Sequence, residues 1–111
     1  MTKSALKFTE PNQGWILHRE EIRTAQDGSC NIYVLLDAYS GFLFGQEISS
    51  DLPASSKILD ILKMAYTRSG TWPMQILILK KDPFAETFKT ICNGLKIPLQ
   101  ELPAKDLKLF T

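Results

Sequence analysis

Carboxylates are the side chains of this sequence best suited to metal-dependent chemistry. Four of them, Glu20, Asp37, Asp82 and Glu86, could form a metal site if the fold brought them together. Two-metal phosphoryl transfer needs several such groups around two cations about 4 Å apart. Structural roles compete with this interpretation, because Asp37 stands in a turn sequence and Asp82 precedes Pro83 as a helix cap would.

Other reactive side chains are few. His18 is the only histidine, and Cys30 and Cys92 lie far apart without a C-x-x-C motif, which excludes four-ligand zinc motifs. We expect two unpaired thiols, with Cys92 on an apolar helical stripe, and we interpret His18 as a structural or surface residue rather than a catalytic base. There is no glycine-rich phosphate loop and no serine in a nucleophile elbow.

Length and composition indicate one folded domain. The chain has 111 residues, of which 44% are hydrophobic, enough for a single modest core. Residues 1–14 are predicted to be an irregular lead-in, and residues 15–111 one domain that stops after its last strand. No apolar run approaches the roughly 20 residues of a membrane span, and the beginning of the chain does not resemble a signal peptide, so we expect a cytoplasmic protein without a membrane partner.

The net charge of +1 argues against binding nucleic acid by bulk electrostatics. A local contact surface remains open, and its candidates are Lys80, Lys81, Lys89 and Lys96. The competing interpretation is that these are solvated lysines on exposed positions. No feature indicates a small-molecule substrate.

The first half of the chain is predicted to be β. Residues 15–23 and 32–36 read as strands joined by a turn at 26–29, and residues 42–48 read as a third strand after a turn at 37–41. These three strands would form an antiparallel meander.

The second half alternates between helix and strand. Residues 50–53 resemble a helix start, Gly70 a helix end, and residues 74–79 a buried strand. Pro98 suits an edge position for a last strand at 97–102. The apolar faces of the two predicted helices are, for the first, Ile58, Leu59, Leu62, Ala65 and Tyr66, and, for the second, Phe84, Phe88, Ile91, Cys92 and Leu95. The predicted fold is α/β, a mixed five-stranded sheet in the order β-β-β-α-β-α-β of ribonuclease H-like proteins.

Several segments resemble one family in order and spacing. They are Trp15-Ile16-Leu17-His18, Val34-Leu35-Leu36-Asp37-Ala38-Tyr39-Ser40-Gly41, Trp72-Pro73, and the stretch from Phe88 to Ile97 with Cys92. Together they are similar to the catalytic core of retroviral integrases and DDE transposases, over the range from about 15 to 102. The family's activity would be DNA strand transfer with Mg²⁺.

The resemblance places the family's catalytic acids on residues that are not acids. Its first Asp falls on His18 and its second on Lys80, with Asp37 and Asp82 expected as the nearest acids. Shifting the alignment to use Asp82 conflicts with its role as a helix cap. The third acid, a Glu on a later helix, has no counterpart in residues 103–111, where Asp106 lacks the motif, and the family's zinc module and DNA-binding region are not recognisable.

Three functions follow as hypotheses. The leading one is a catalytically inactive core, a pseudoenzyme derived from a mobile element, that acts by associating with macromolecules, chiefly as a homodimer. It would use no cofactor, since Mg²⁺ is expected only with an intact acid site. The second is a module that binds nucleic acid without cleaving it. The third is a divergent metal-dependent nuclease built from the four acids named first.

Overall fold

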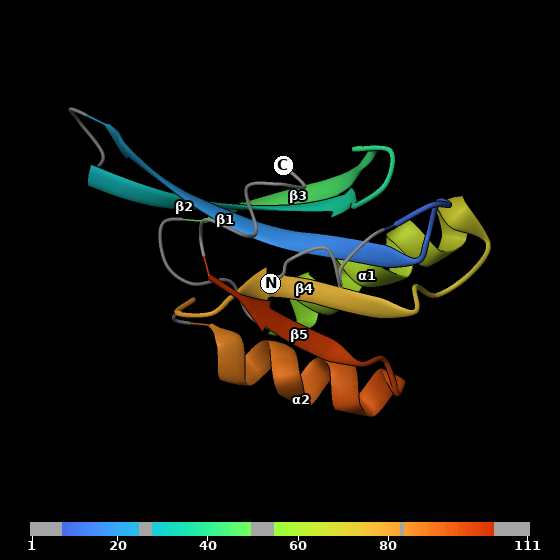
Figure 1. Ribbon diagram of the computed structural model, residues 1–111. Helices are drawn as coiled ribbons and strands as arrows, with labels where there is room; N and C mark the ends of the chain where they lie inside the picture. Colours follow the sequence, from blue (N-terminus) through green and yellow to red (C-terminus); the bar gives the residue numbers. More distant parts are fainter. Residues whose placement is uncertain (1–7, 25–27, 50–54, 83, 104–111) are drawn as a thin grey trace.

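The computed structural model describes residues 8–24, 28–49, 55–82 and 84–103. Five strands form one sheet in the spatial order β3-β2-β1-β4-β5 (Figure 1). The strands are β1 (Gly14–Thr24), β2 (Gly28–Asp37), β3 (Leu43–Ser49), β4 (Gln75–Leu79) and β5 (Leu99–Leu102), and the helices are α1 (Ser55–Ser69) and α2 (Ala85–Leu95). The predicted element order and the mixed five-stranded sheet are confirmed.

The strand pairings have the predicted directions. The first three strands are an antiparallel meander, while β4 pairs parallel to both β1 and β5. The pairing of β1 with β4 ends at Leu17 opposite Ile78, whereas β1 continues to Thr24 alongside β2. The ends of β1 and β2 therefore project beyond the rest of the sheet as a two-stranded ribbon (Figure 1).

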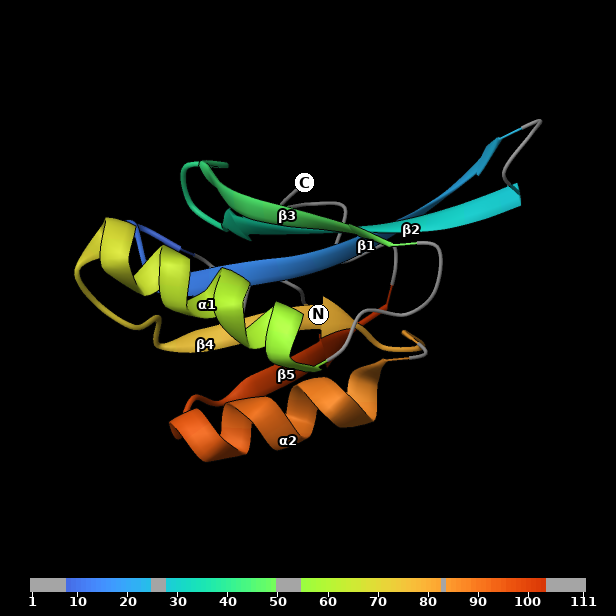
Figure 2. The same cartoon turned by 180° about the vertical axis from the view of Figure 1, so that it is seen from behind.

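Both helices cover one face of the sheet and enclose the main core (Figure 2). Alternate residues of each strand point into it, as a pleated strand requires. Trp15 and Leu17 of β1 pack there, and Phe88 of α2 meets the ring of Tyr33 edge-on at 5.6 Å between centroids. We call this side of the sheet the helix face.

The opposite side, here called the open face, carries a smaller cluster. Ile16 and Leu77 of the central strands are fully buried there, together with Leu102 and the partly buried Phe8. Further out, the β2–β3 register aligns Ile32 with Ile48 and Leu36 with Leu43. Ile48 and Leu43 are 57% and 47% exposed, so apolar side chains of β3 remain in contact with solvent.

The lead-in is not detached from the domain. Asn12 donates its backbone N–H to Asp37 Oδ1 at 2.8 Å and accepts the Trp15 Nε1–H on its side chain at 2.9 Å. Phe8 packs close against Gly14, where an added Cβ would lie 2.4 Å from its ring. This contact leaves no room for a side chain at Gly14.

The buried stripe of α1 differs from the prediction. Ile61 is buried beside Ile58, Leu62 and Ala65, whereas Tyr66, predicted to be buried, is 41% exposed. Tyr66 instead stacks on Trp72 at 4.6 Å between ring centroids. The sequence pattern could not show this, because the aromatic partner comes from the connection after the helix.

The helix ends explain the strand boundaries. Gly70 has a φ of 81° and donates its backbone N–H to the carbonyl oxygen of Tyr66, which confirms it as the end of α1. Lys96, which follows the last residue of α2, is its C-cap and has a φ of 61°. Ile97 then donates its backbone N–H to the carbonyl oxygen of Cys92. Ile97 is therefore held by the helix end, and β5 begins at Leu99 rather than at the predicted residue 97. The predicted helix start at 50–53 and turn residues 26 and 27 lie outside the described residues.

The part of the chain that the structure describes contains no helix both long and apolar enough to traverse a lipid bilayer.

Cys92 should be an unreactive thiol. Burial raises its pKa from an ordinary value of 9.0 to about 11, and it is only 3% exposed. The folded pKa lies above the unfolded one, so this residue stabilises the fold fully below pH 9 and less as pH rises towards 11. We expect the free energy of unfolding, measured by urea titration, to fall less between pH 9 and pH 11 in the Cys92→Ala variant than in the parent protein.

The two thiols should also differ in reactivity. In the native parent at pH 8, iodoacetamide should label the half-buried Cys30 well before Cys92.

Candidate functional site

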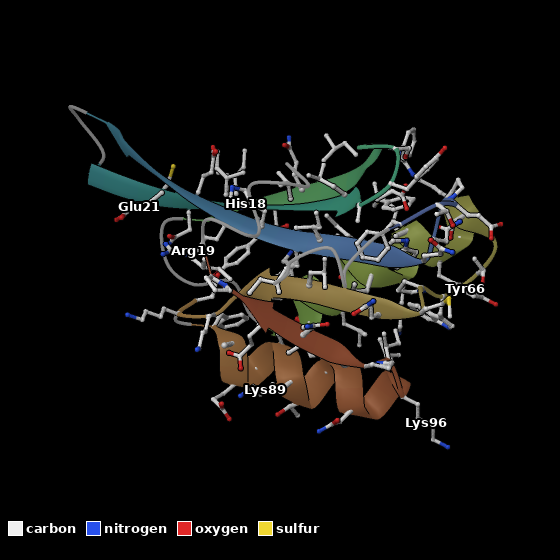
Figure 3. All side chains as sticks on the ribbon, in the orientation of Figure 1. His18, Arg19, Glu21, Tyr66, Lys89 and Lys96 are labelled. Carbon is white, nitrogen blue, oxygen red and sulfur yellow. The ribbon has the colours of Figure 1, made fainter. Side chains whose placement is uncertain are left out.

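His18 follows Leu17, the last residue of β1 that pairs with β4, and Lys80 follows Leu79, the last residue of β4, so both lie near the same end of the parallel strands. His18 is half-buried on the open face, with Nε2 3.7 Å from Glu20 Oε1 (Figure 3). Lys80 donates its backbone N–H to Leu102 at 2.8 Å while its side chain is exposed. The structure thus brings the two positions where the resemblance places the family's acids to one end of the parallel strands.

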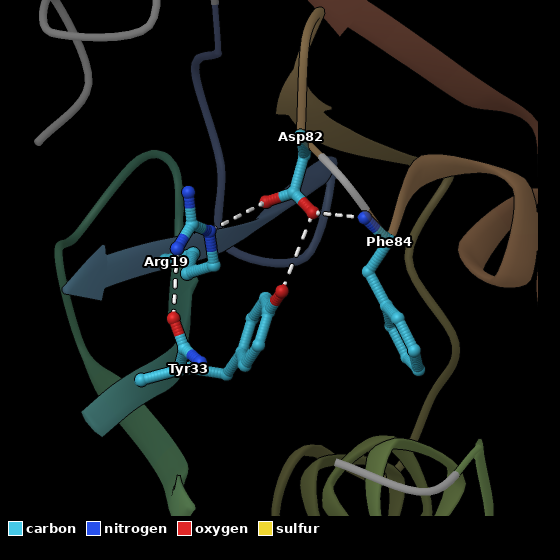
Figure 4. Close-up of polar contacts among 5 residues, drawn as sticks. Arg19, Tyr33, Asp82 and Phe84 are labelled. Atoms are coloured by element: carbon cyan, nitrogen blue, oxygen red, sulfur yellow. Dashed lines mark hydrogen bonds and ion pairs between the residues drawn. The ribbon is translucent and has the colours of Figure 1, made fainter. Parts of the chain in front are cut away.

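Asp82 lies just beyond this end but turns into the protein. Its side chain is 1% exposed, and Oδ2 lies 3.7 Å from Nε of Arg19 (Figure 4). Oδ1 accepts hydrogen bonds from the Tyr33 hydroxyl at 3.3 Å and from the Phe84 backbone N–H at 2.7 Å. Burial, followed by the charge of Asp82, raises the pKa of Tyr33. This carboxylate is therefore engaged by three groups of the protein.

Strand alternation explains how a guanidinium reaches Asp82. Trp15, Leu17 and Arg19 share one side of β1, so Arg19 stands on the helix face at the border of the core. Its Nη1 donates to Asn31 Oδ1 at 2.8 Å. Within the described residues, Arg19 Nε and Asp82 Oδ2 have no hydrogen bond, so their mutual charge attraction must offset that loss.

Asp82 also organises the start of α2, as predicted. Its side chain binds the N–H of Phe84, and its carbonyl oxygen accepts the N–H of Ala85 at 3.0 Å. The residue in the N-cap position is Phe84, which makes no side-chain cap bond, so Asp82 acts two residues earlier than a standard cap. Pro83 lies outside the described residues.

Asp37 is at the other end of the sheet. The β1–β2 register places it opposite Trp15, three residues from His18 along β1, which is about 10 Å. Its Oδ2 accepts the backbone N–H and the hydroxyl of Ser40, both at 2.7 Å. The predicted turn-capping role is confirmed, and the expected proximity to His18 does not occur, because antiparallel strands end at opposite edges.

The remaining candidates are dispersed. Glu86 on α2 pairs with Lys89 at 3.1 Å, and Lys89 also lies 3.4 Å from Glu101. The hydrogen bond to Glu86 raises the pKa of Lys89. Lys96 stands at the opposite end of α2 (Figure 3), while Lys80 and Lys81 are exposed after β4. The four lysines thus do not form a single surface.

The residues at this end of the strands do not fit Mg²⁺, which prefers several oxygen ligands. In residues 8–24, 28–49, 55–82 and 84–103, no three His, Cys, Asp or Glu side chains are placed to share a metal ion. Asp82 is already neutralised by Arg19, and Glu20 lies 3.7 Å from the His18 imidazole. A divalent cation at Asp82 would have to break its pair with Arg19 and accept an ammonium group nearby.

The sequence reasoning missed Arg19 and Tyr33. A usable signal existed, since each occupies a core-facing position of an alternating strand, next to Leu17 and Leu35 respectively. A charged or hydroxyl-bearing side chain at such a position requires a buried partner. The partner could not be identified, because Asp82 is distant in sequence.

Loss of the Asp82 charge should destabilise the fold. Asp82→Asn leaves an acceptor for Phe84 but removes the counterion of Arg19, and we expect a loss of about 3 kcal/mol in urea unfolding. Glu86→Gln is the matched control on an exposed ion pair and should cost under about 1 kcal/mol. The double variant Arg19→Met with Asp82→Asn should recover part of the loss. Equal effects of Asp82→Asn and Glu86→Gln would refute a structural role for the buried pair.

Comparison with solved structures identifies the fold. The catalytic core of HTLV-2 integrase, determined in complex with magnesium in a dimeric form, superposes with a TM-score of 0.64 at 18% identity, covering 86% of this chain and 64% of that one. The simian T-cell lymphotropic virus intasome, in complex with PP2A regulatory subunit B56 gamma, gives 0.65 at 19% identity, covering 92% and 39%. The catalytic domain of Mos1 mariner transposase gives 0.57 at 10% identity, covering 84% and 50%.

These likenesses confirm the predicted ribonuclease H-like fold and its similarity to integrase and transposase cores. No protein-family model matches the chain, and no curated protein sequence does. The chain spans just under two thirds of the HTLV-2 core and a smaller part of the intasome protein.

Proposed function

We propose that this chain is a catalytically inactive ribonuclease H-like core that acts by associating with other macromolecules, chiefly with a second copy of itself. The observation that carries the first half of this proposal is the position of Asp82. The buried acid that follows Lys80 along the chain serves the fold, through Arg19, Tyr33 and the start of α2. A side chain used in this way is not free to bind a catalytic metal. The acid beside His18, Glu20, is exposed and belongs to no group of three side chains placed to share a metal ion among the described residues.

Charge supports the same conclusion. An ammonium group about 4 Å from a divalent cation is repelled by roughly 8 kcal/mol at an effective dielectric constant near 20. Lys80 and Lys81 stand together at the end of β4, where the resembled enzymes are expected to have an acid. These lysines would oppose metal binding at this end, whereas the acids of an active core would favour it.

Metal binding should therefore be undetectable. We expect millimolar Mg²⁺ or Mn²⁺ to leave the Tm unchanged, because an ion that does not bind the native state cannot stabilise it. Single- and double-stranded DNA should remain uncut in the same buffers. Metal-dependent cleavage that disappears in Asp82→Asn or Asp37→Asn, but persists in Glu86→Gln, would instead establish a divergent nuclease.

Exposed apolar side chains support the association half of the proposal. Phe42, Leu43 and Ile48 are each about half exposed at or near β3. Large apolar side chains exposed along one edge strand can serve as an interaction site. The exposed positions of α2, by contrast, are polar, with Glu86, Thr90 and Asn93 among them, so this helix offers little apolar surface to a partner.

Self-association is tested by mass. Light scattering coupled to size-exclusion chromatography should give a mass that rises from monomer towards dimer over micromolar concentrations, because a reversible homodimer obeys mass action. A strict monomer throughout that range would refute self-association and leave binding to a different macromolecule.

A second candidate function is nucleic-acid binding without cleavage. The adjacent exposed residues Lys80 and Lys81 favour it, but Lys89 is engaged by two carboxylates and Lys96 is remote. Binding by the two free lysines would weaken steeply with salt. Affinity that is undetectable at low salt, or that equals the parent's in a Lys80→Gln, Lys81→Gln variant, would dismiss this candidate.

A further inference from the structure

The two edges of the sheet differ in how well they are protected. β5 has only four residues, lies between Pro98 and Pro103, and carries Glu101 in an ion pair with Lys89. β3 has seven residues, none of them proline or lysine. Short length, proline, charge and β-bulges are means by which proteins prevent edge strands from pairing with other chains, and β3 has a bulge where its pairing with β2 skips Phe44, which leaves the stretch from Gly45 onwards regular. Of the two edges, β3 is the one left able to pair.

The backbone of β3 has hydrogen-bonding capacity to spare. β2 pairs with one side of it, and β3 ends the order of the described sheet on the other side. One row of its N–H and C=O groups therefore has no strand partner among the described residues. Such a row is a template for an added strand.

Apolar side chains flank this edge on both faces. On the open face lie Leu43 and Ile48, and on the helix face lies Met64 of α1, which is 46% exposed. Met64 approaches Gly45 closely, since an added Cβ there would lie 3.7 Å from its sulfur. A strand added at this edge would therefore gain apolar contacts above and below the hydrogen-bonded ladder.

We infer that β3 pairs antiparallel with β3 of a second copy, about a two-fold axis through Gln46, and so joins two five-stranded sheets into one. The inference rests on the proposed self-association and specifies its surface. A two-fold axis makes the interface isologous, so one strand supplies both halves of the ladder. A two-fold axis normal to the sheet keeps the open faces of both copies on the same side, and the β-bulge at Phe44, which the β2–β3 register skips, limits the regular ladder to the residues around Gln46.

Charge excludes one central register and is compatible with an axis through Gln46. Glu47 is the only ionisable residue of β3, and an axis through it would oppose two carboxylates, which is unfavourable. An axis through Gln46 sets Glu47 opposite Gly45 of the second copy, where no like charge stands. Lys57, Asp60 and Arg68 are exposed at helical spacing along the stripe of α1 that includes Met64, so this side of the edge carries charges of both signs.

Disulfide formation tests the register in the full chain. In a Cys30→Ser background, Gln46→Cys should form an intermolecular disulfide on mild copper-catalysed oxidation, because the two side chains would be direct cross-strand neighbours, about 5 Å apart at Cβ. Glu47→Cys should form far less, since its two copies would be diagonal at about 7–8 Å. Gln100→Cys on β5 is the control and should not cross-link, with about 43 Å between copies across nine strand spacings.

A charge on the edge provides the second measurement. We expect Ile48→Lys to weaken dimerisation by at least about tenfold, because it buries a charge between the copies. Met74→Lys is the matched control at an apolar residue that is 70% exposed and remote from β3, and it should change the dimer affinity by less than about twofold. Retained protection of Cys92 against alkylation shows that each variant is folded.

The outcomes separate this inference from the proposed function. A monomeric parent refutes both. A dimeric parent that survives Ile48→Lys and gives no Gln46→Cys disulfide overturns the β3 interface and leaves self-association standing. A disulfide stronger at Glu47→Cys than at Gln46→Cys likewise overturns the inferred register.

Discussion

Burial of β1 on both faces is the constraint on which the rest of the structure depends. Trp15, Ile16 and Leu17 are all 2% exposed or less, because β2 and β4 pair on either side of the strand and side chains cover it above and below. Such a strand tolerates few polar groups. His18 and Arg19 are the first residues after this buried segment, and polar side chains become possible from there on. His18 lies beside Glu20, and Arg19 is paired with Asp82.

At that end of the strand we propose that the buried ion pair of Arg19 and Asp82 affects function as well as stability. Asp82 holds Arg19 and Tyr33 against the core and fixes the start of α2. In a fold shared with metal-dependent enzymes, the same position in space would be valuable for binding cations. Placing an arginine on the neighbouring strand directs the carboxylate inward, and a guanidinium cannot be displaced by a cation without leaving a charge buried and unpaired.

The two edge strands of the sheet, β3 and β5, differ in how well they are protected against pairing with another chain. β5 lies between two prolines, whereas β3 is longer, apolar on both flanks and carries a single charge. Antiparallel meanders leave such an edge available unless sequence features block it. His18 pairs with Val34 and Val34 pairs with Gln46, so the proposed interface is centred level with the proposed former reaction centre and is separated from it by β2 alone.

The sequence by itself determined the element order and the resemblance, because alternation, helical periodicity and turn residues are local properties, and it led to the prediction that His18 and Lys80 occupy the places of the family's acids. It also indicated the turn role of Asp37 and the helix-start role of Asp82, since both bind backbone groups a few residues away. Only the tertiary structure decided that Asp37 lies far from His18, that Asp82 binds Arg19, and that Tyr66 stacks on Trp72. Strand direction decides which ends meet, and contacts between distant segments depend on how the strands and helices pack, which no local pattern encodes.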